Sequence, residues 1–474
     1  MKNEMEKVLA IEGKRITPSA HERKRIEALA KDLEKKVGAA AKKLRLKAIV
    51  RTEGSVAKDT WVTREPDIDV FMRVPSSIPR AKLGEICLKV AKEATNGLKQ
   101  IERFADHPYL EVFVDGIRVN IVPCYDVRRG GWISATDRTH FHTDYINKHM
   151  PPEKRGEVRL LKKFMKGIDV YGAEIKVGGF SGYLCELLVL YYGSFLHTIE
   201  SFARNGQKVV VDVADHYRDR REELDLLFHE PLVVVDPVDA VRNVASAVRE
   251  QKFYTFVAAS QMFLRNPRPD FFEPERTIPL NLSRLKQMLD DRGSRIVFIV
   301  FRGAMFVPDI LWGQLYKSQR SLRKLIDLNG FQVLRDLAWS DEKNLNLFIF
   351  ELQDCCVLPV KLHLGPPLDK IREGERFIQK HLGNANTVCG PYVENGRWQV
   401  LLHRKYTDVC ALLRDNLRDG GKEVGVSEGF SGTLKSGIKV LVDEEIDEIY
   451  GKNREFAVFL TEFLIGKPKW LVAG

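Results

Sequence analysis

The fold is decided by residues 54–69, which read GSVAKDTWVTREPDID and separate two segments with the pattern of strands. Residues 46–52 alternate well enough to be the first strand, and residues 67–74 (DIDVFMRV), bounded by prolines, read as the second. Side chains two positions apart on a strand share a face. We therefore expect Asp67 and Asp69 to project together, while the residues between and after them enter an apolar core.

The pair formed by Asp67 and Asp69 predicts a metal site. Neighbouring carboxylates repel and raise each other's pKa unless a cation lies between them. Mg²⁺ prefers a couple of carboxylates together with water and substrate phosphates. Gly54 and Ser55 just upstream offer a bend and free backbone N–H groups, which suit a phosphate at a helix start. An exposed strand face is the alternative, but Asp is depleted in strands and the alternate face is apolar, so the metal site is favoured.

The composition indicates several domains and a polyanionic partner. At 474 residues the chain is too long for one core, and three or four domains are expected. Lys plus Arg total 75 against 65 Asp plus Glu, and the resulting charge of +10 suits a polyanion without distinguishing RNA from DNA or lipid. The seven cysteines include no CxxC pair, which argues against a zinc knuckle and favours a reducing, cytoplasmic setting.

Neither a targeting signal nor a membrane segment is expected. Residues 1–15 are charged throughout, unlike a signal peptide. The longest apolar run, residues 183–196, is interrupted by Glu186 and is too short to span a bilayer. We therefore expect a cytoplasmic protein with no membrane partner.

Several segments have helical periodicity and recognisable starts. Thr17 and the proline after it are expected to open an amphipathic helix that extends to about Leu44. Residues 159–166 read as a short basic helix, and Ser181 is placed to cap an apolar one. Arg242 is expected to open a further helix.

A hairpin is predicted between residues 109–114 and residues 117–122. The Asp-Gly dipeptide at residues 115–116 is a strong signal for a two-residue turn. Counting cross-strand partners from that turn places Glu111 directly opposite Asn120.

The best domain boundary is the Pro- and Phe-rich stretch at residues 266–279. Beyond it, strand and helix patterns alternate as strand, helix, strand and strand at residues 295–301, 309–328, 331–339 and 344–352. This order predicts a small α+β unit of ferredoxin-like type. No RNP-type aromatic motif accompanies it, so the sequence gives little support for RNA binding through its sheet.

Five stretches together resemble the archaeal class I CCA-adding enzymes, within the DNA polymerase β-like nucleotidyltransferase superfamily. In chain order they are GSVAKDTWV…DIDVF, VNIVPCY, DRTHFH, YGAEIKVGGFSGYLCELLVLYYGSF and VVVDPVDAVRNVA. The likeness covers about residues 50–260 and is weaker beyond. It implies an α+β multidomain fold with a catalytic nucleotidyltransferase head at 1–150, a helical neck at 151–205, a body at 206–290, and a tail with a return to the body at 291–474.

The resemblance also implies an activity. The family adds C, C and A to the 3′ end of tRNA from CTP and ATP, without a nucleic-acid template and with Mg²⁺. The implied partners are CTP, ATP, and tRNA held at its acceptor stem and T arm through phosphates and 2′-hydroxyls. A homodimer is left open by the sequence.

The resemblance assigns roles to individual residues. Asp67 and Asp69 match the metal-binding carboxylates, Asp67 standing where the family pattern also allows Glu. The residues implied at the nucleotide are Gly54, Ser55 and Lys58 at the triphosphate, Thr139 and His142 near the nucleotide, Lys162 and Tyr171 at phosphates, and Arg242 at the base. These residue types suit those roles, because Lys and Tyr donate to phosphates and Arg presents a planar fork to a base edge. Taken singly, His142 and Tyr171 could equally be structural, and Lys162 could be a solvated lysine.

One position departs from the family pattern. The third carboxylate is expected where this chain has Asn120, whose neutral amide cannot take a proton from the attacking hydroxyl. Three explanations are open: an impaired natural or engineered form, a metal held by the Asp pair alone, or a substitute carboxylate. For the last we consider Glu111, which the hairpin count places about 5 Å from Asn120 at Cβ.

Two rival functions follow from these observations. A poly(A) polymerase-like enzyme of the same superfamily would use ATP alone and extend any RNA end. A catalytically silent tRNA-binding protein would bind tRNA but incorporate no nucleotide, and Asn120 makes that rival worth testing.

Overall fold

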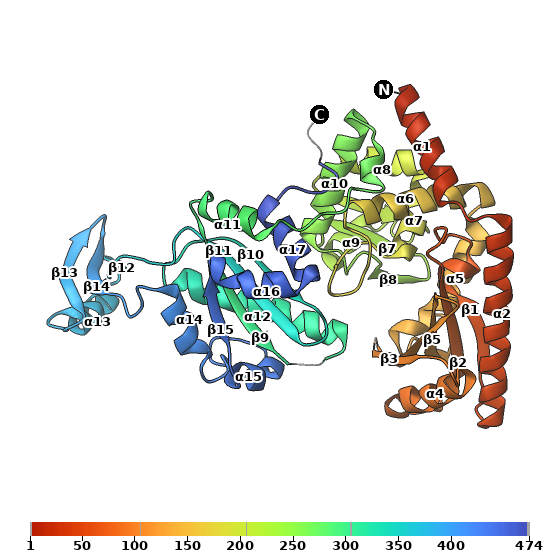
Figure 1. Cartoon of the computed structure of the whole chain (residues 1–474), viewed down its shortest axis with the longest axis horizontal. Helices are drawn as coiled ribbons and strands as arrows, with labels where there is room; N and C mark the ends of the chain where they lie inside the picture. The colour runs from red at the N-terminus through yellow and green to blue at the C-terminus, as the bar shows by residue number, and fades with distance from the viewer. Residues whose placement is uncertain (1, 105, 205, 304–305, 472–474) are drawn as a thin grey trace. The chain divides into compact units, whose positions relative to one another are not determined.

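The computed structural model describes residues 2–104, 106–204, 206–303 and 306–471 (Figure 1). The chain divides into two compact units, Met1–Arg276 together with Lys467–Gly474, and Thr277–Gly466. The division falls inside the Pro- and Phe-rich stretch at residues 266–279. No helix in the described ranges combines the length and apolar character needed to cross a bilayer.

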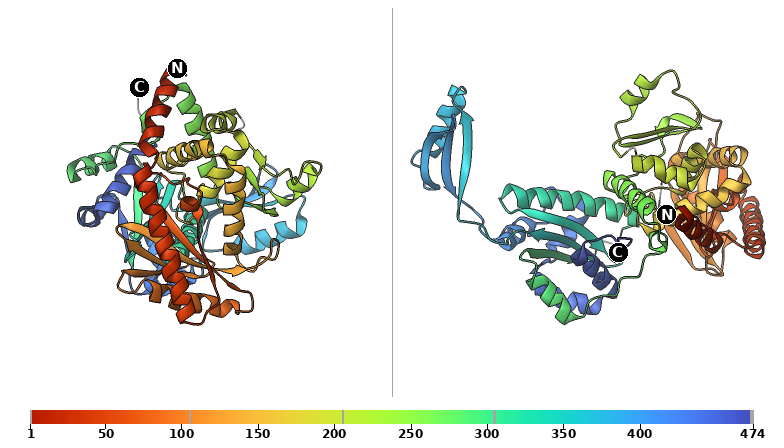
Figure 2. Two further views of the ribbon diagram at one scale, coloured as in Figure 1. Left: turned by 90° about the vertical axis from the view of Figure 1, so that its right-hand side faces the viewer. Right: turned by 90° about the horizontal axis from the view of Figure 1, so that it is seen from above.

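The first unit begins with a five-stranded sheet in the order β1-β2-β5-β4-β3. Its strands are β1 (Ile49–Glu53), β2 (Asp67–Pro75), β3 (Gln100–Phe104), β4 (Pro108–Val114) and β5 (Ile117–Asp126). Strands β2 and β5 are parallel and the other pairs are antiparallel. The helices of this part are α1 (Lys2–Ile16), α2 (Ala20–Lys43), the single turn α3 (Gly54–Ala57) and α4 (Arg80–Ala94). Helices α2 and α4 share one apolar core with the sheet, and the long α2 runs beside it in Figure 2, left.

The predicted start of the second helix is wrong by two residues. Ser19, not Thr17, caps α2, because its Oγ accepts a hydrogen bond of 3.1 Å from the backbone N–H of Glu22. The Thr17 hydroxyl instead donates to the carbonyl of Gly13 in the preceding helix, at 2.6 Å. The predicted apolar side is confirmed, since Ile26 and other regularly spaced apolar residues of α2 are buried.

The predicted hairpin is confirmed in its register. Glu111 on β4 pairs with Asn120 on β5. On the other side of β5, the parallel register sets Asn120 beside Asp69 and Arg118 beside Asp67. Two positions of one β5 face therefore lie directly against the two aspartates of β2.

The remainder of the first unit is mainly helical, with a small three-stranded sheet. The helices are α5 (Thr139–His149), α6 (Arg155–Gly167), α7 (Gly182–Tyr192), α8 (Phe195–Arg204), α9 (Arg221–Leu227) and α10 (Glu250–Arg265), with 3-10 turns η1 (Ala135–Arg138), η2 (Pro152–Lys154) and η3 (Pro269–Phe271). The sheet contains β6 (Val209–Asp212), β7 (Leu232–Asp236) and β8 (Asp239–Asn243). The core is dense in aromatic rings around Phe164, which contacts Phe195, Phe256, Phe263, Phe271 and Phe272.

Of the two helix starts predicted for this region, one is confirmed and one is wrong. The Ser181 cap is confirmed, since its Oγ accepts from the backbone N–H of Leu184 at 3.1 Å. The prediction that Arg242 opens a helix is wrong, because Arg242 lies in β8 and the helix begins only at Glu250. Asn243 fixes this strand: its amide donates to the Leu232 carbonyl at 3.0 Å and thereby ties β8 to β7.

The second unit contains the predicted ferredoxin-like arrangement. Its four-stranded sheet has the order β10-β11-β9-β15, with every pair antiparallel. The strands are β9 (Arg295–Arg302), β10 (Val333–Ser340), β11 (Leu345–Leu352) and β15 (Lys439–Val442). Helices pack on both faces, namely α12 (Pro308–Leu328), α14 (Val409–Leu417) and α15 (Glu428–Lys435) on one, and α11 (Leu282–Asp290), α16 (Asp447–Lys452) and α17 (Arg454–Ile465) on the other, where the turn η4 (Asp443–Ile446) also lies.

A smaller module is inserted between β11 and α14. It consists of β12 (Val360–Pro367), α13 (Ile371–His381), β13 (Thr387–Glu394) and β14 (Arg397–His403), in a sheet of order β12-β14-β13. The views of Figures 1 and 2 agree that this module stands apart from the four-stranded sheet of its own unit.

Candidate active site

A cavity of about 310 Å³ lies where β2, α3, α5, α6 and α7 meet in the first unit. It is lined by Gly54, Ser55, Lys58, Asp67, Asp69, Thr139, His142, Thr143, Lys162, Tyr171, Gly182, Tyr183 and Glu186. All the residues assigned above to the metal and the nucleotide are in this lining except Asn120 and Arg242. The structure therefore brings together side chains that are far apart in the sequence.

The aspartates face the cavity from β2 and are held by donors on β5. The amide Nδ2 of Asn120 donates to Asp69 Oδ1 at 2.9 Å. The guanidinium of Arg118 donates to both oxygens of Asp67, from Nε at 2.9 Å and from a terminal nitrogen at 2.5 Å. Ile68, between the two aspartates, is fully buried in the opposite direction.

Gly54 allows the chain to approach Asp69 closely. Its φ is +72°, in the left-handed region that favours glycine. A Cβ at this position would lie 2.3 Å from Asp69 Oδ2. The turn α3 and the carboxylate can be neighbours only because no side chain separates them.

The floor of the cavity is a buried cluster around Glu186 of α7. Its Oε2 accepts from Lys58 Nζ at 2.5 Å, and its Oε1 accepts from the Thr60 hydroxyl at 2.5 Å and from Lys162 Nζ at 3.2 Å. Lys162 also donates to the Thr60 carbonyl at 3.1 Å. Two lysines around one carboxylate leave this buried cluster with one net positive charge.

Tyr171 lies beside Lys162 at the cavity wall. It forms an isolated parallel bridge with Phe180, which returns the chain to the start of α7. A Cβ on Gly182 would lie 3.0 Å from the Tyr171 hydroxyl and 3.4 Å from Lys162 Nζ. The glycine therefore leaves room for both donors at one point of the wall.

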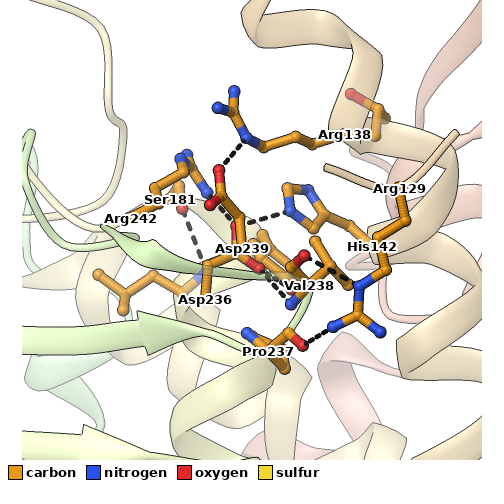
Figure 3. A network of polar contacts seen from close by, with 12 residues as sticks. Arg129, Arg138, His142, Ser181, Asp236, Pro237, Val238, Asp239 and Arg242 are labelled. Atoms are coloured by element: carbon orange, nitrogen blue, oxygen red, sulfur yellow. Dashed lines mark hydrogen bonds and ion pairs between the residues drawn. The ribbon is translucent and has the colours of Figure 1, made fainter. Parts of the chain in front are cut away.

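His142 and Arg242 meet at one buried carboxylate, that of Asp236 at the end of β7 (Figure 3). His142 Nε2 lies 2.8 Å from Asp236 Oδ2, and the Arg242 guanidinium donates to the same oxygen at 2.7 Å. The other oxygen accepts from the Tyr183 hydroxyl at 3.3 Å and the backbone N–H of Val238 at 3.0 Å. Arg242 thus joins the cavity wall through Asp236, and the Tyr183 ring stacks on His142 at 4.1 Å.

The turn that carries Asp236 is fastened to η1 and the loop before it. Arg138 donates to Asp239 Oδ2 at 2.7 Å. Arg129 donates to the carbonyls of Pro237 at 2.7 Å and Val238 at 3.0 Å (Figure 3). These bonds fix the position of the turn relative to Thr139 and His142, which follow in α5.

Comparisons with known proteins identify the family. Two family models match, "tRNA nucleotidyltransferase, second domain" over residues 156–273 and "CCA-adding enzyme, C-terminal domain" over residues 292–442. A CCA-adding enzyme of Methanosarcina barkeri is 37% identical over 459 residues, covering 95% of this chain and 96% of that protein. Another, from Methanothermobacter thermautotrophicus, is 36% identical over 464 residues with the same coverage.

This chain belongs to the CCA-adding enzyme family. The family is one of nucleotidyltransferases, and the mixed α and β architecture agrees with the predicted fold class. Solved structures are less similar: one of the Cid1 poly(U) polymerase is 16% identical with a TM-score of 0.44, over 58% of this chain and 99% of that chain.

The donor set at Asp67 and Asp69 fits one Mg²⁺ ion of the kind this family uses. Two carboxylates, completed by water and substrate phosphates, are the usual protein contribution to a Mg²⁺ site. Within the described residues, no group of three or more His, Cys, Asp or Glu side chains gathers as metal ligands. Burial raises the pKa of Asp69 to about 6, and the charge of Asp67 adds to the increase, against the hydrogen bond from Asn120.

Asn120 stands in this family member where the third carboxylate is expected, and it presents a donor. Glu111 lies opposite it as predicted, yet the Glu111 carboxylate accepts from Arg103 at 2.9 and 3.2 Å and does not line the cavity. The geometry therefore gives no support to Glu111 as a substitute ligand.

The charges of the cavity floor follow from burial and mutual contact. Burial alone would raise the pKa of Glu186, but Lys58 and Lys162 outweigh it and hold that pKa below its usual range. Burial lowers the pKa of Lys162, against the attraction of Glu186. The reading of Lys162 as a solvated lysine is wrong, because the residue is 2% exposed.

The Asp236 network holds a neutral histidine. Burial lowers the pKa of His142, so its imidazole is uncharged at neutral pH and donates from Nε2 to the ionised Asp236. Burial alone would raise the pKa of Asp236, but the hydrogen bond from His142 and the charge of Arg242 hold it low. Asp236 therefore stays an acceptor that fixes both partners.

Sequence reasoning missed several residues of this site. Glu186 was visible only as an interruption of an apolar run, and a lone charge among apolar residues was the available signal. Asp236 lies in the VVVDPVDAVRNVA stretch, but nothing in its spacing points to His142. Arg118 precedes Asn120 by two positions, and the strand period places it beside Asp67 once β2 and β5 pair in parallel.

Proposed function

We propose that this chain adds C, C and A to the 3′ end of tRNA from CTP and ATP, without a nucleic-acid template. One observation carries the proposal beyond family membership. The carboxylates Asp67 and Asp69 and a buried positive cluster line the same cavity, so a triphosphate can reach both at once.

The proposed reaction is an in-line attack by the terminal 3′-hydroxyl of tRNA on the α-phosphorus of CTP or ATP. The new bond joins O3′ to this phosphorus, the bond to the bridging oxygen of the β-phosphate breaks, and the hydroxyl passes its proton to solvent water. Mg²⁺ bound by Asp67 and Asp69 would neutralise the charge that develops on the phosphate oxygens and orient pyrophosphate as the leaving group.

The protein groups around the triphosphate have separate tasks. Lys58 and Lys162 supply the net positive charge for the phosphates, and Glu186 holds both lysines in place. Tyr171 adds a hydroxyl donor at the same wall. Backbone N–H groups after Gly54 and the Ser55 hydroxyl suit the phosphate oxygens nearest to Asp69.

Arg242 is proposed to read the base. Asp236 holds its guanidinium through one terminal nitrogen, and 36% of the Arg242 side chain is exposed. A planar guanidinium fixed in this way can present its other N–H groups to acceptors on a cytosine or adenine edge. His142, Tyr183 and Thr139 form the adjoining wall of the cavity.

We also propose the domain bounds, the tRNA contacts and the cellular location. The head is residues 1–150, the neck 151–205, the body 206–290 and the tail 291–474, with the basic neck, body and tail holding the acceptor stem and T arm of tRNA in the cytoplasm. The seven cysteines, all with free thiols, are compatible with a reducing compartment. Activity does not require a homodimer in this account.

A labelled-nucleotide assay on tRNA that lacks its 3′ terminal CCA tests the proposal. We expect incorporation of both CTP and ATP, and its loss in Asp69→Asn. Incorporation of ATP alone onto any RNA would favour the poly(A) polymerase-like rival. The specific observation that favours the silent tRNA-binding rival is Asn120, and tRNA binding without incorporation at any Mg²⁺ or Mn²⁺ concentration would establish it.

A further inference from the structure

The two aspartates of the site face two donors on the neighbouring strand. Asp67 pairs with Arg118 and Asp69 pairs with Asn120, at alternate positions of one parallel register. The superfamily pattern instead calls for a third carboxylate at the Asn120 position. In this chain β5, the strand expected to contribute a carboxylate, contributes the cation of Arg118 and the amide of Asn120.

The net charge of this site therefore differs from that of a site with three carboxylates. Three carboxylates carry three negative charges, and two divalent ions leave that site with one net positive charge. Here two carboxylates and the guanidinium of Arg118 carry one net negative charge. A single divalent ion leaves this site with the same net positive charge.

We propose that this centre takes one divalent ion with its nucleotide, and that the guanidinium of Arg118 supplies the positive charge of the second. The inference rests on the proposed function, because it concerns how the same site stabilises the same transfer. In this proposal Arg118 takes the place of the expected second ion. Its ion pair with Asp67 is then part of the site and not only a structural contact.

A second ion has no adequate ligands at this place. Asn120 turns its amide N–H toward Asp69, so the group nearest the expected ion is a donor. Glu111, the next carboxylate on this face, does not line the nucleotide cavity. Within the described residues, no third acidic or imidazole ligand joins Asp67 and Asp69.

Asp67 lines two cavities, and these separate the Arg118 guanidinium from the proposed divalent ion. The 310 Å³ cavity holds the proposed nucleotide groups, whereas a larger cleft of about 770 Å³ is lined by Arg118, Asp67 and the turn at Gly116. Arg118 is absent from the lining of the smaller cavity. A metal ion can therefore approach Asp67 from the nucleotide side while Arg118 keeps a contact from the cleft side.

Arg118 fits this task by its chemistry. A guanidinium is always charged and holds a carboxylate through two parallel hydrogen bonds, as observed at 2.5 and 2.9 Å. Its side chain is 48% exposed, so water can reach it from the cleft side. It can shift from two hydrogen bonds to one when the ion binds.

The test counts bound Mn²⁺ by electron paramagnetic resonance, with a non-hydrolysable CTP analogue present and with a protein-free sample as the blank. We expect one Mn²⁺ per chain in the wild-type protein. We expect Arg118→Gln to bind that ion about tenfold more tightly, because the like charge that pairs with the same carboxylate is removed. The double variant Arg118→Gln with Asn120→Asp should bind two ions.

Arg103→Gln is the matched control, since it also removes an arginine that pairs with a carboxylate across the strands of this sheet. It should keep one ion at wild-type affinity. Two ions in the wild-type protein, or equal Mn²⁺ affinity in Arg118→Gln and Arg103→Gln, would overturn the inference. The wild-type count needs no variant to fold.

The readout separates this inference from the proposed function. One bound ion without nucleotide incorporation would support the charge replacement and refute the proposed activity. Two bound ions with normal CCA addition would refute the charge replacement and leave the activity intact.

Discussion

Lys58 Nζ lies 2.5 Å from Glu186 Oε2, and the two residues are 128 positions apart in the chain. Both are buried, and Lys162 completes a cluster in which one carboxylate neutralises one of two ammonium groups. The contact joins the turn after α3 to helix α7. Glu186 is thus a positioning residue for the lysines that face the phosphates.

Replacing Glu186 with glutamine should destabilise the first unit by about 3–5 kcal/mol, because it leaves two buried ammonium groups without a counter-charge. Urea unfolding followed by circular dichroism measures the change. Glu65→Gln is the control, since Glu65 pairs with Lys166 at the surface and its loss should change stability by less than about 1 kcal/mol. Equal effects of the two variants would contradict the role given to Glu186.

The same cluster predicts a pH dependence. The pKa of Glu186 is held below its ordinary value of 4.5, so its stabilising contribution is fully present above that pH. The contribution is lost as the pH falls from 4.5 through the lowered pKa of the folded state. The stability difference between wild type and Glu186→Gln should therefore be constant near neutral pH and shrink toward pH 3. A difference that grows on acidification would be the wrong sign.

Asp236 should affect activity through its contacts with His142 and Arg242. In Asp236→Asn the charged bond to Arg242 and the acceptor for His142 are weakened, and kcat/KM for both CTP and ATP should fall about 100-fold through misplacement of the base-reading group. Steady-state kinetics measures this effect. Asp239→Asn is the control on the same turn, because it loses only the bond from Arg138. Equal losses of kcat/KM in the two variants would mean that displacement of the turn, and not misplacement of Arg242, lowers the activity.

Gly54→Ala should inactivate the site with little effect on the fold elsewhere. The added Cβ would lie 2.3 Å from Asp69 Oδ2, so the carboxylate or the turn must move. A displacement of this size should lower kcat about 100-fold. Gly38→Ala in helix α2 is the control, since its Cβ would meet nothing within 4 Å. Wild-type turnover in Gly54→Ala would show that the close approach is unimportant.

Local features of the site could be predicted because they follow from short-range rules. The period of two puts Asp67 and Asp69 on one face, and the Asp-Gly turn fixes Glu111 opposite Asn120. Both follow from strand geometry alone. The same period also predicts Arg118 beside Asp67 once β2 and β5 are paired in parallel.

Features that depend on packing could not be predicted in this way. Arg242 follows a turn and precedes small and apolar residues, which resembles a helix start, but pairing with β7 makes it a strand residue. Ser19 caps α2 rather than Thr17, because α1 extends to Ile16 and takes up the Thr17 hydroxyl. Glu186 meets Lys58 from 128 positions away and Asp236 meets His142 from 94 positions away, and no spacing in the sequence encodes these two contacts.

Asn120→Asp should make the protein depend on divalent ions for stability. The new carboxylate loses the hydrogen bond to Asp69 and repels it, which should cost about 1–2 kcal/mol in EDTA. Added Mg²⁺ should recover this loss, whereas it should change the wild-type protein less. Thermal unfolding with and without Mg²⁺ measures both. An Asn120→Asp protein as stable as wild type in EDTA would contradict the repulsion.

Sequencing the 3′ ends of tRNA after reaction with all four nucleoside triphosphates and Mg²⁺ measures CCA addition itself. The substrate is tRNA that lacks its CCA end, and Asp69→Asn is the inactive control. We expect products that end in C, C and A and then stop. Unchanged ends, or tails of adenylate or mixed sequence, would contradict this expectation.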